Sequence, residues 1–187
     1  MAKNKRAVDR QLKTDEIENA ATRLFVERGF DATSMAMIAA EADVAPNTLY
    51  WYYPSKDDIL VGVLNRLVAA GLSEWNTQRD QPFAQQLLWV IEQFTRSRDL
   101  VSTVHARTAH SDSVREWHDQ FHAMLDTVLV RQLSSRGMSA SQAKLMATIG
   151  TFVVEGLLSH PHSASQREAV VNWLAGKPGS PARDEGV

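Results

Sequence analysis

The sequence predicts an all-α protein: an N-terminal head of three short helices, then a larger helical body, with about nine helices in total. Apolar residues recur at the three- and four-residue spacing of amphipathic helices along almost the whole chain. Alternating β-branched runs bounded by turn residues are absent, so no strand is expected. We place the head and a preceding basic arm at residues 1–54, the body at 55–175 and a flexible tail rich in Gly, Pro and charge at 176–187.

The three helices of the head are marked by caps and breakers. The first follows Thr14, a plausible N-cap, and ends at Gly29. The second follows Thr33 or Ser34, and the third begins at Pro46, where the first helical position tolerates proline. The inward-facing residues of the first two helices are Ile17, Ala20, Ala21, Leu24 and Phe25, and Met35, Ile38, Ala39 and Ala42.

Six further helices are expected in the body. Ser55 with Asp58 and Ser139 with Gln142 resemble capping boxes, and Gln81-Pro82 and Gly137 interrupt the helical pattern. The first of these helices opens at the Ser55 box and is broken at Gln81-Pro82, and the second carries Phe83, Leu87, Val90, Ile91 and Phe94. The other four cover about 99–109, 113–136, 143–159 and 165–175.

The helix over 143–159 is apolar on nearly all sides, and such a helix must be covered on more than one face. A partner subunit would provide the cover, although a central helix in a monomer is the alternative. The residues expected at a homodimer interface are Ile149, Phe152, Val153, Leu157, Val170 and Leu174.

Composition and charge limit the function classes. The chain of 187 residues has no cysteine, which excludes disulfides, thiolate metal sites and cysteine nucleophiles. No secretory signal or apolar run of membrane-spanning length is present, so a cytoplasmic protein is expected. The net charge of −2 argues against a nonspecific nucleic-acid coat.

The first 13 residues are basic in contrast to the rest of the chain. They carry five basic residues and one acidic residue, which gives a charge of +4. Such an arm can follow a DNA backbone or enter a minor groove, but a solvated, disordered terminus has the same composition.

The second and third helices of the head, joined by a tight turn, form a helix-turn-helix pattern. Ala39 and Ala42 provide small side chains where the two helices cross, and Val44 can fix the turn to the core. No acidic residue lies between Val44 and Pro54, so this helix can enter a major groove.

An ordered set of residues runs through the first 60 positions: Phe25, Gly29, Phe30, Thr33, Ser34, Met35, Ile38, Ala39, Ala42, Asp43, Val44, Ala45, Thr48, Leu49, Tyr50, Tyr52, Tyr53, Ser55 and Lys56. This set resembles the tetracycline-repressor (TetR) family. The resemblance implies a DNA-binding repressor whose body holds a ligand pocket and dimerises through its last two long helices.

The resemblance also implies which residues contact DNA. Thr33 and Ser34 would bind a phosphate through hydroxyl and helix-start N–H groups, and Tyr50, Tyr52 and Lys56 would contact other phosphates. The residues nearest the base edges would be Ala45, Pro46, Asn47 and Thr48, with Asn47 able to pair bidentately with adenine.

Two residues depart from the family pattern. Asp43 replaces a common glycine, but it tolerates the left-handed turn better than most residues. Ala45 replaces a common serine cap, which costs around 1 kcal/mol.

Aromatic and histidine side chains of the body could line a cavity for a small apolar or aromatic effector, although plain core is the alternative. His118 and His122 also share one helix face, a spacing that binds a transition metal when further ligands converge. We assign no metal, cofactor or catalytic residue, and leave open whether the histidines bind a metal. The candidate ligand contacts are Trp75, Trp89, Phe94, His105, Trp117, His118, Phe121 and Phe152.

The sequence therefore predicts a homodimeric repressor that binds a palindromic DNA operator and is released by a small molecule. A constitutive or partner-controlled regulator without a ligand is the alternative. An enzyme is not expected, because no assembled catalytic motif is present.

Overall fold

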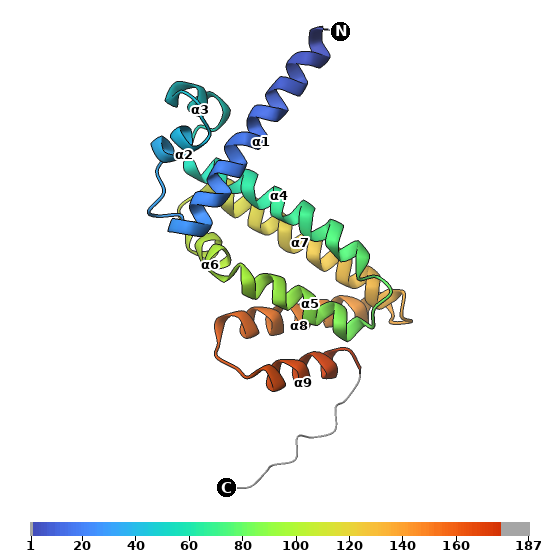
Figure 1. The fold of residues 1–187 in the computed structure, drawn as a ribbon. Helices are drawn as coiled ribbons and strands as arrows, with labels where there is room; N and C mark the ends of the chain where they lie inside the picture. The colour runs from blue at the N-terminus through green and yellow to red at the C-terminus, as the bar shows by residue number, and fades with distance from the viewer. Residues whose placement is uncertain (1, 177–187) are drawn as a thin grey trace. The chain divides into compact units, whose positions relative to one another are not determined.

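The computed structural model describes residues 2–176, with the side chains of residues 8–176, and this part of the chain folds into nine α-helices without a strand (Figure 1). The all-α prediction is therefore confirmed. Residues 177–187 of the predicted tail lie outside the described residues. The helices are α1 (Ala2–Arg28), α2 (Met35–Glu41), α3 (Pro46–Tyr52), α4 (Lys56–Thr77), α5 (Phe83–Arg96), α6 (Arg98–Arg107), α7 (Asp112–Ser134), α8 (Ala140–Ser159) and α9 (Ala164–Leu174).

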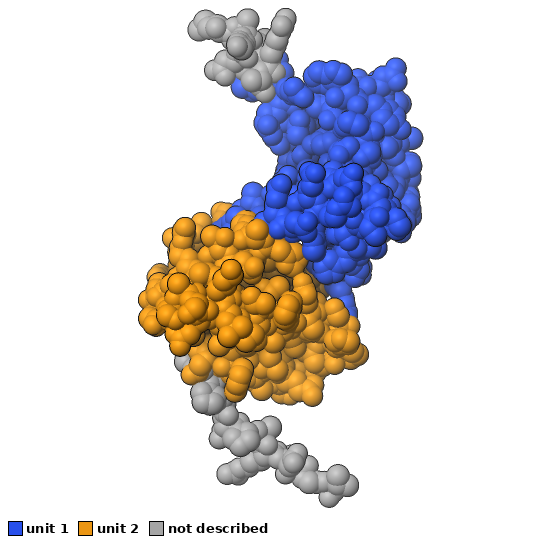
Figure 2. All heavy atoms as spheres, turned by 180° about the vertical axis from the view of Figure 1, so that it is seen from behind, with its two compact units in different colours: residues 1–72, 98–121 blue, residues 73–97, 122–187 orange. Residues whose placement is uncertain are grey.

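The helices form two compact units, coloured separately in Figure 2. The first unit comprises residues 1–72 and 98–121, and the second comprises residues 73–97 and 122–187. The first unit thus contains the three head helices together with most of α4, α6 and the start of α7. No helix in the described part of the chain is long and apolar enough to span a membrane.

The core of the first unit joins the head to the helices that support it. Ile17, Ala20 and Ala21 of α1 are fully buried, as predicted, against Ile38, Leu49 and other apolar residues of the head. The same cluster continues into α4, α6 and α7 through Ile59, Leu60, Val63, Leu64, Val104 and Val114. Moving the head away from its supports would expose this shared apolar surface, which is costly in water.

Helix α1 is longer than predicted. It begins at Ala2 and includes the basic segment that the sequence suggested as an arm before the helix. Alanine, lysine, arginine and glutamine in this segment are good helix formers, so nothing forces the helix to start at Thr14. The correction makes the N-terminal segment a helical extension of the head.

The second unit is held together by smaller apolar clusters. Phe83, Leu133 and Ala143 form one, and Ala84, Ile91 and Val171 form another. Ser139 and Gln142 make the predicted capping box at the start of α8, and Ser163 and Gln166 make an equivalent box before α9. These boxes satisfy backbone N–H groups that would otherwise lack partners at the helix starts.

Candidate nucleic-acid interface

The turn between α2 and α3 has the geometry of a helix-turn-helix. Asp43 adopts a φ of 50°, which confirms the left-handed conformation expected for it. The Val44 N–H donates to the Ala39 carbonyl at 3.0 Å, and Ala39 and Ala42 are buried. The small side chains allow the two helices to approach, and the turn then directs α3 outward.

Helix α3 has one buried anchor and an exposed face. Leu49 is fully buried, whereas Pro46, Asn47 and Thr48 are exposed and Tyr50 is 52% exposed. Ala45 caps the helix without a side-chain hydrogen bond, and Pro46 occupies its start, both as predicted. The exposed face therefore presents an amide, a hydroxyl and a phenol without a nearby acidic residue on the same helix.

The aromatic residues at the end of α3 point in different directions. Tyr52 is partly buried, whereas Trp51 is 65% exposed and has the Arg10 guanidinium carbon of α1 at 4.9 Å from its ring centre. Tyr53 donates from its hydroxyl to Glu18 Oε1 at 2.5 Å. Burial, followed by this hydrogen bond to Glu18, raises the pKa of the Tyr53 phenol above its ordinary value. Trp51 and Arg10 thus tie the basic segment of α1 to the exposed end of α3.

Thr33 does not occupy the exposed position that a phosphate contact requires. Its side chain is 1% exposed, and its hydroxyl donates to the Gly29 carbonyl at 2.8 Å. The hydroxyl satisfies a carbonyl at the end of α1, and burial keeps it from solvent. Ser34 is exposed and caps α2 by accepting a hydrogen bond from Met37 N at 3.2 Å, so of the two residues it is the one accessible to solvent.

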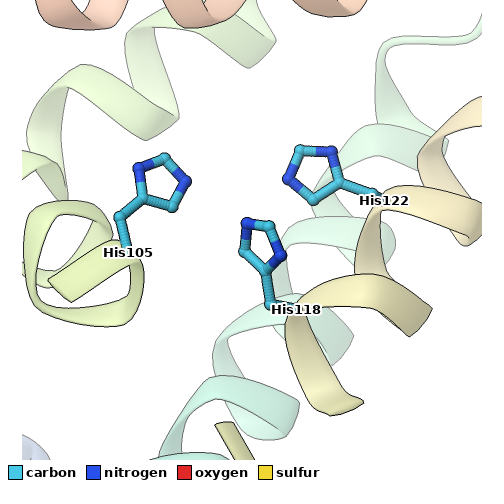
Figure 3. Close-up of side chains that lie close together, drawn as sticks. All are labelled: His105, His118 and His122. Carbon is cyan, nitrogen blue, oxygen red and sulfur yellow. The ribbon is translucent and has the colours of Figure 1, made fainter. Parts of the chain in front are cut away.

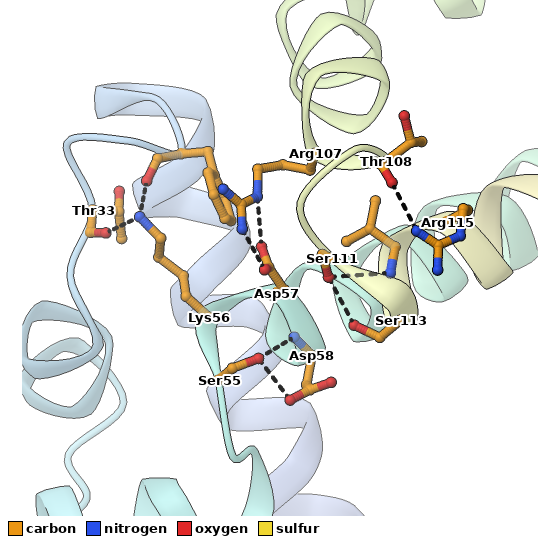
Figure 4. Close-up of polar contacts among 12 residues, drawn as sticks. Thr33, Ser55, Lys56, Asp57, Asp58, Arg107, Thr108, Ser111, Ser113 and Arg115 are labelled. Carbon is orange, nitrogen blue, oxygen red and sulfur yellow. Dashed lines mark hydrogen bonds and ion pairs between the residues drawn. The ribbon is translucent and has the colours of Figure 1, made fainter.

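Lys56 binds the loop between α1 and α2 (Figure 4). Its ammonium group donates to the carbonyls of Phe30 at 2.7 Å and Thr33 at 2.8 Å, and lies 4.1 Å from the Phe30 ring centre. Burial lowers the pKa of this ammonium group relative to an exposed lysine. These contacts favour a structural role for Lys56, and the predicted phosphate contact stays untested.

Arg107, at the end of α6, makes a two-bond ion pair with Asp57 at the start of α4 (Figure 4). The distances are 3.0 Å and 2.6 Å, and the guanidinium carbon also lies 5.8 Å from the Phe30 ring centre. Sequence patterns gave no sign of this contact, because 50 residues separate its partners. It connects α6 directly to the first turn of α4, beside the loop that Lys56 holds.

The predicted ligand contacts fall into the two units. In the first unit, Trp117 stacks on Phe121 with ring centres 5.0 Å apart, and its indole donates to Asn65 at 2.8 Å. In the second unit, the rings of Trp75 and Trp89 lie 6.2 Å apart. Phe94 is partly buried, and Phe152 is 68% exposed on α8 and therefore fits a surface contact better than an enclosed pocket. His105 and His118 are considered below with His122.

The predicted dimer residues are exposed to different degrees. Ile149, Phe152 and Val170 are exposed, and Val153 and Leu157 are partly buried. Leu174 was wrongly expected on this surface, because it is 8% exposed and packs inward. Its neighbour Trp173 is 66% exposed, and Leu145, one helical turn before Ile149, is 64% exposed. We call Leu145, Ile149, Phe152, Val170 and Trp173 the apolar stripe of α8 and α9.

Comparisons with known proteins agree with this geometry. The family model described as bacterial regulatory proteins of the tetR family matches residues 17–63. An uncharacterised HTH-type transcriptional regulator of Haemophilus influenzae is 34% identical over 82 residues, which cover 41% of this chain and 44% of that protein. The HTH-type transcriptional repressor KstR of Rhodococcus jostii is 26% identical over 163 residues, covering 84% of this chain and 77% of that protein.

The fold is shared with solved structures at low identity. The Thermus thermophilus FadR structure, a TetR-family repressor in complex with lauroyl-CoA, has a TM-score of 0.63 and 19% identity. The match covers 93% of this chain and all of that one. The matches to the first three curated relatives cover less than half of those proteins.

Proposed function

Because the chain belongs to the TetR family of bacterial regulatory proteins, we propose that it is a DNA-binding transcriptional repressor that responds to a small molecule. Two copies would bind a palindromic operator, with one α3 helix in each of two successive major grooves. The observation that carries this proposal is the exposed face of α3, which presents Asn47, Thr48 and Tyr50 from a helix anchored by the buried Leu49.

The exposure and chemistry of each residue of the head indicate which part of the DNA it would contact. Asn47 offers both a donor and an acceptor, as required for bidentate pairing with adenine, and Thr48 offers a hydroxyl and a methyl group. Tyr50 and Ser34 lie at exposed positions from which they would contact phosphates. Arg10, stacked on Trp51, adds a positive charge beside the same surface.

Dimerisation is proposed through the apolar stripe. Leu145, Ile149 and Phe152 recur at intervals of four and three residues, so they share one face of α8. A group of large exposed apolar side chains on one surface usually marks an interaction site. A second copy of the chain is the partner that a palindromic operator requires.

Response to a small molecule is supported by a relative and by the contacts of α6. The FadR structure is a complex with lauroyl-CoA, so this fold holds a small molecule in that protein. In this chain, Arg107 joins α6 to the start of α4 beside the head. An effector would have to bind one conformation of the body more tightly than the other in order to release DNA.

The first test is electrophoretic retardation of DNA from upstream of the protein's own gene. Asn47→Ala should weaken operator binding by about 1–3 kcal/mol, roughly fivefold to 150-fold, and should relax the preference for one base pair. Asn76→Ala is the matched control, because Asn76 is an exposed asparagine in the last turn of α4 and does not belong to the head. Equal losses from both variants, or no retardation by the wild-type protein at micromolar concentration, would contradict the proposal.

A further inference from the structure

Three histidines of the body gather on two helices, His105 on α6 and His118 and His122 on α7 (Figure 3). One potential ligand atom from each lies within 4.8 Å of the other two. We propose that these residues form a binding site for a divalent transition metal of intermediate softness, with zinc as the representative ion.

The arrangement follows from helix geometry. His118 and His122 are four residues apart, so they project from the same face of α7. His105 approaches from α6, and its ring meets that of His118 edge to face with centres 5.2 Å apart. Sequence spacing indicated the pair on α7, but only the fold identifies His105 as the third member.

The donor set selects the class of metal. Imidazole nitrogens suit zinc, copper, nickel and iron, whereas magnesium and calcium prefer oxygen ligands. Three imidazoles leave a fourth tetrahedral position for water or another ligand. Nitrogens bound to one tetrahedral zinc lie about 3.3 Å apart, given Zn–N distances of about 2.0–2.1 Å. Small side-chain rotations would bring the three nitrogens from within 4.8 Å of one another to this separation. Such rotations are possible because His105 is exposed and the other two rings are only partly buried.

Two carboxylates lie beside the histidine rings. Glu155 Oε1 is 3.8 Å from His122 Nε2, and Asp119 Oδ1 is 3.5 Å from His118 Nδ1. Glu155 is the only acidic residue between Leu145 and Leu158 of the apolar helix α8. Carboxylates next to metal-binding histidines orient the rings, and one can also provide the fourth ligand. Their negative charges favour a cation at this position.

The position of the site would also let a bound metal influence DNA binding by the head. This part of the inference rests on the proposed function. His105 precedes Arg107 by two residues on α6, and Arg107 holds Asp57 at the first turn of α4. A metal that fixes His105 against α7 would restrict the end of α6, and with it the ion pair that supports the head. Metal binding would then change affinity for the operator.

The direct test is titration of untagged, full-length protein with zinc chloride against a chromophoric chelator. We expect one zinc per chain and, with cobalt, the intense visible absorption of a tetrahedral site. His118→Ala and His122→Ala should each lower zinc affinity by at least tenfold, on the order of the losses measured even for residues that only orient ligands. His110→Ala and His160→Ala are the matched controls, because these histidines are exposed outside the cluster.

Circular dichroism of each variant separates loss of metal from loss of fold. Unchanged zinc binding in the folded triple variant of His105, His118 and His122 would overturn the site, as would equal losses in the control variants. Retardation of operator DNA with and without zinc then tests the coupling to the head. Zinc that binds the histidines and leaves operator affinity unchanged would overturn the coupling, and this result is distinct from failure of DNA binding itself.

Discussion

The ammonium group of Lys56 shows how the protein itself can bind a basic side chain beside the helix proposed to read DNA. The family resemblance implies a phosphate contact for Lys56, at the start of the helix after the head. In the structure its four-carbon chain reaches back to the carbonyls of Phe30 and Thr33. A charged donor on two partly buried carbonyls fixes the loop that leads into α2, and thereby the position of α3.

Replacement of Lys56 should therefore reduce stability. Lys56→Ala leaves two carbonyls without their donor, and we expect the free energy of unfolding to fall by about 1–3 kcal/mol. Urea denaturation followed by circular dichroism measures the change. Lys144→Ala, at an exposed position of α8, is the control and should change stability by less than about 0.5 kcal/mol. If Lys56→Ala instead has normal stability and reduces the salt dependence of DNA binding, a phosphate contact by Lys56 is supported.

At the scale of helices, α1 and α4 approach closely at Gly62. A Cβ atom at this position would lie 2.5 Å from Glu18 Oε1 and 2.9 Å from the Tyr53 hydroxyl, the two groups that hydrogen-bond to each other. Nearby, Arg66 of α4 binds Asp15 and Asn19 of α1 at 2.9 Å and 2.8 Å. The absence of a side chain at Gly62 thus allows one polar layer to join α1, α3 and α4.

Because of this packing, alanine substitutions at two glycines of α4 should change the stability of the protein in opposite directions. Gly62→Ala should destabilise the protein by about 1–3 kcal/mol, because the added methyl group overlaps Glu18 and Tyr53. Gly71→Ala should stabilise it by about 0.5–1 kcal/mol, because nothing lies within 4 Å and alanine favours the helix. Thermal unfolding of both variants compares them. A gain in stability from Gly62→Ala would show that α1 and α4 can separate at no cost.

Helix boundaries were predictable where a single residue decides them. Pro46 begins α3, Gly29 and Gly137 follow helix ends with positive φ, and Ser139 with Gln142 caps α8. The start of α1 was not predictable, since good helix formers precede Thr14 and only context decides whether they are ordered. The inward face of α9 was also ambiguous, because adjacent residues such as Trp173 and Leu174 differ by only about 100° around a helix.

The candidate sites were also predictable to different extents, because some of their contacts are local in the sequence and others are not. The exposed face of α3 follows from local spacing around one buried leucine. Thr33, Lys56 and Arg107 instead depend on contacts with residues 4, 26 and 50 positions away, and the longer of these contacts leave no local pattern. His105 joins the other two histidines through the packing of α6 on α7.

At the scale of the whole molecule, the charge distribution bears on how the proposed dimer would bind DNA. Residues 14–60 carry three basic and nine acidic residues, so bulk attraction of the head to DNA is weak. In the proposed dimer, specific contacts from two linked heads would compensate for this, because the second head would bind at a high effective concentration. Operator affinity should therefore depend on the apolar stripe as strongly as on α3.

A charge within the stripe tests this dependence. Phe152→Glu should raise the dimer dissociation constant by roughly 30-fold or more, as for a central interface residue, and weaken operator binding in parallel. Analytical ultracentrifugation and DNA retardation provide the two measurements. Leu72→Glu is the control, because Leu72 is an exposed leucine of α4 outside the stripe. A monomer of Phe152→Glu with full operator affinity would refute the link between dimerisation and binding.

The uncapped start of α3 has a consequence for the motions of the free protein. A seven-residue helix is too short to be stable alone, and here it lacks the side-chain cap that α2 and α8 possess. Its order depends mainly on burial of Leu49, so its amide hydrogens should exchange with solvent sooner than those of α4, which is three times as long. The helix proposed to read DNA would then be the part of the head that unfolds locally most easily, and DNA binding would include the free-energy cost of keeping it folded.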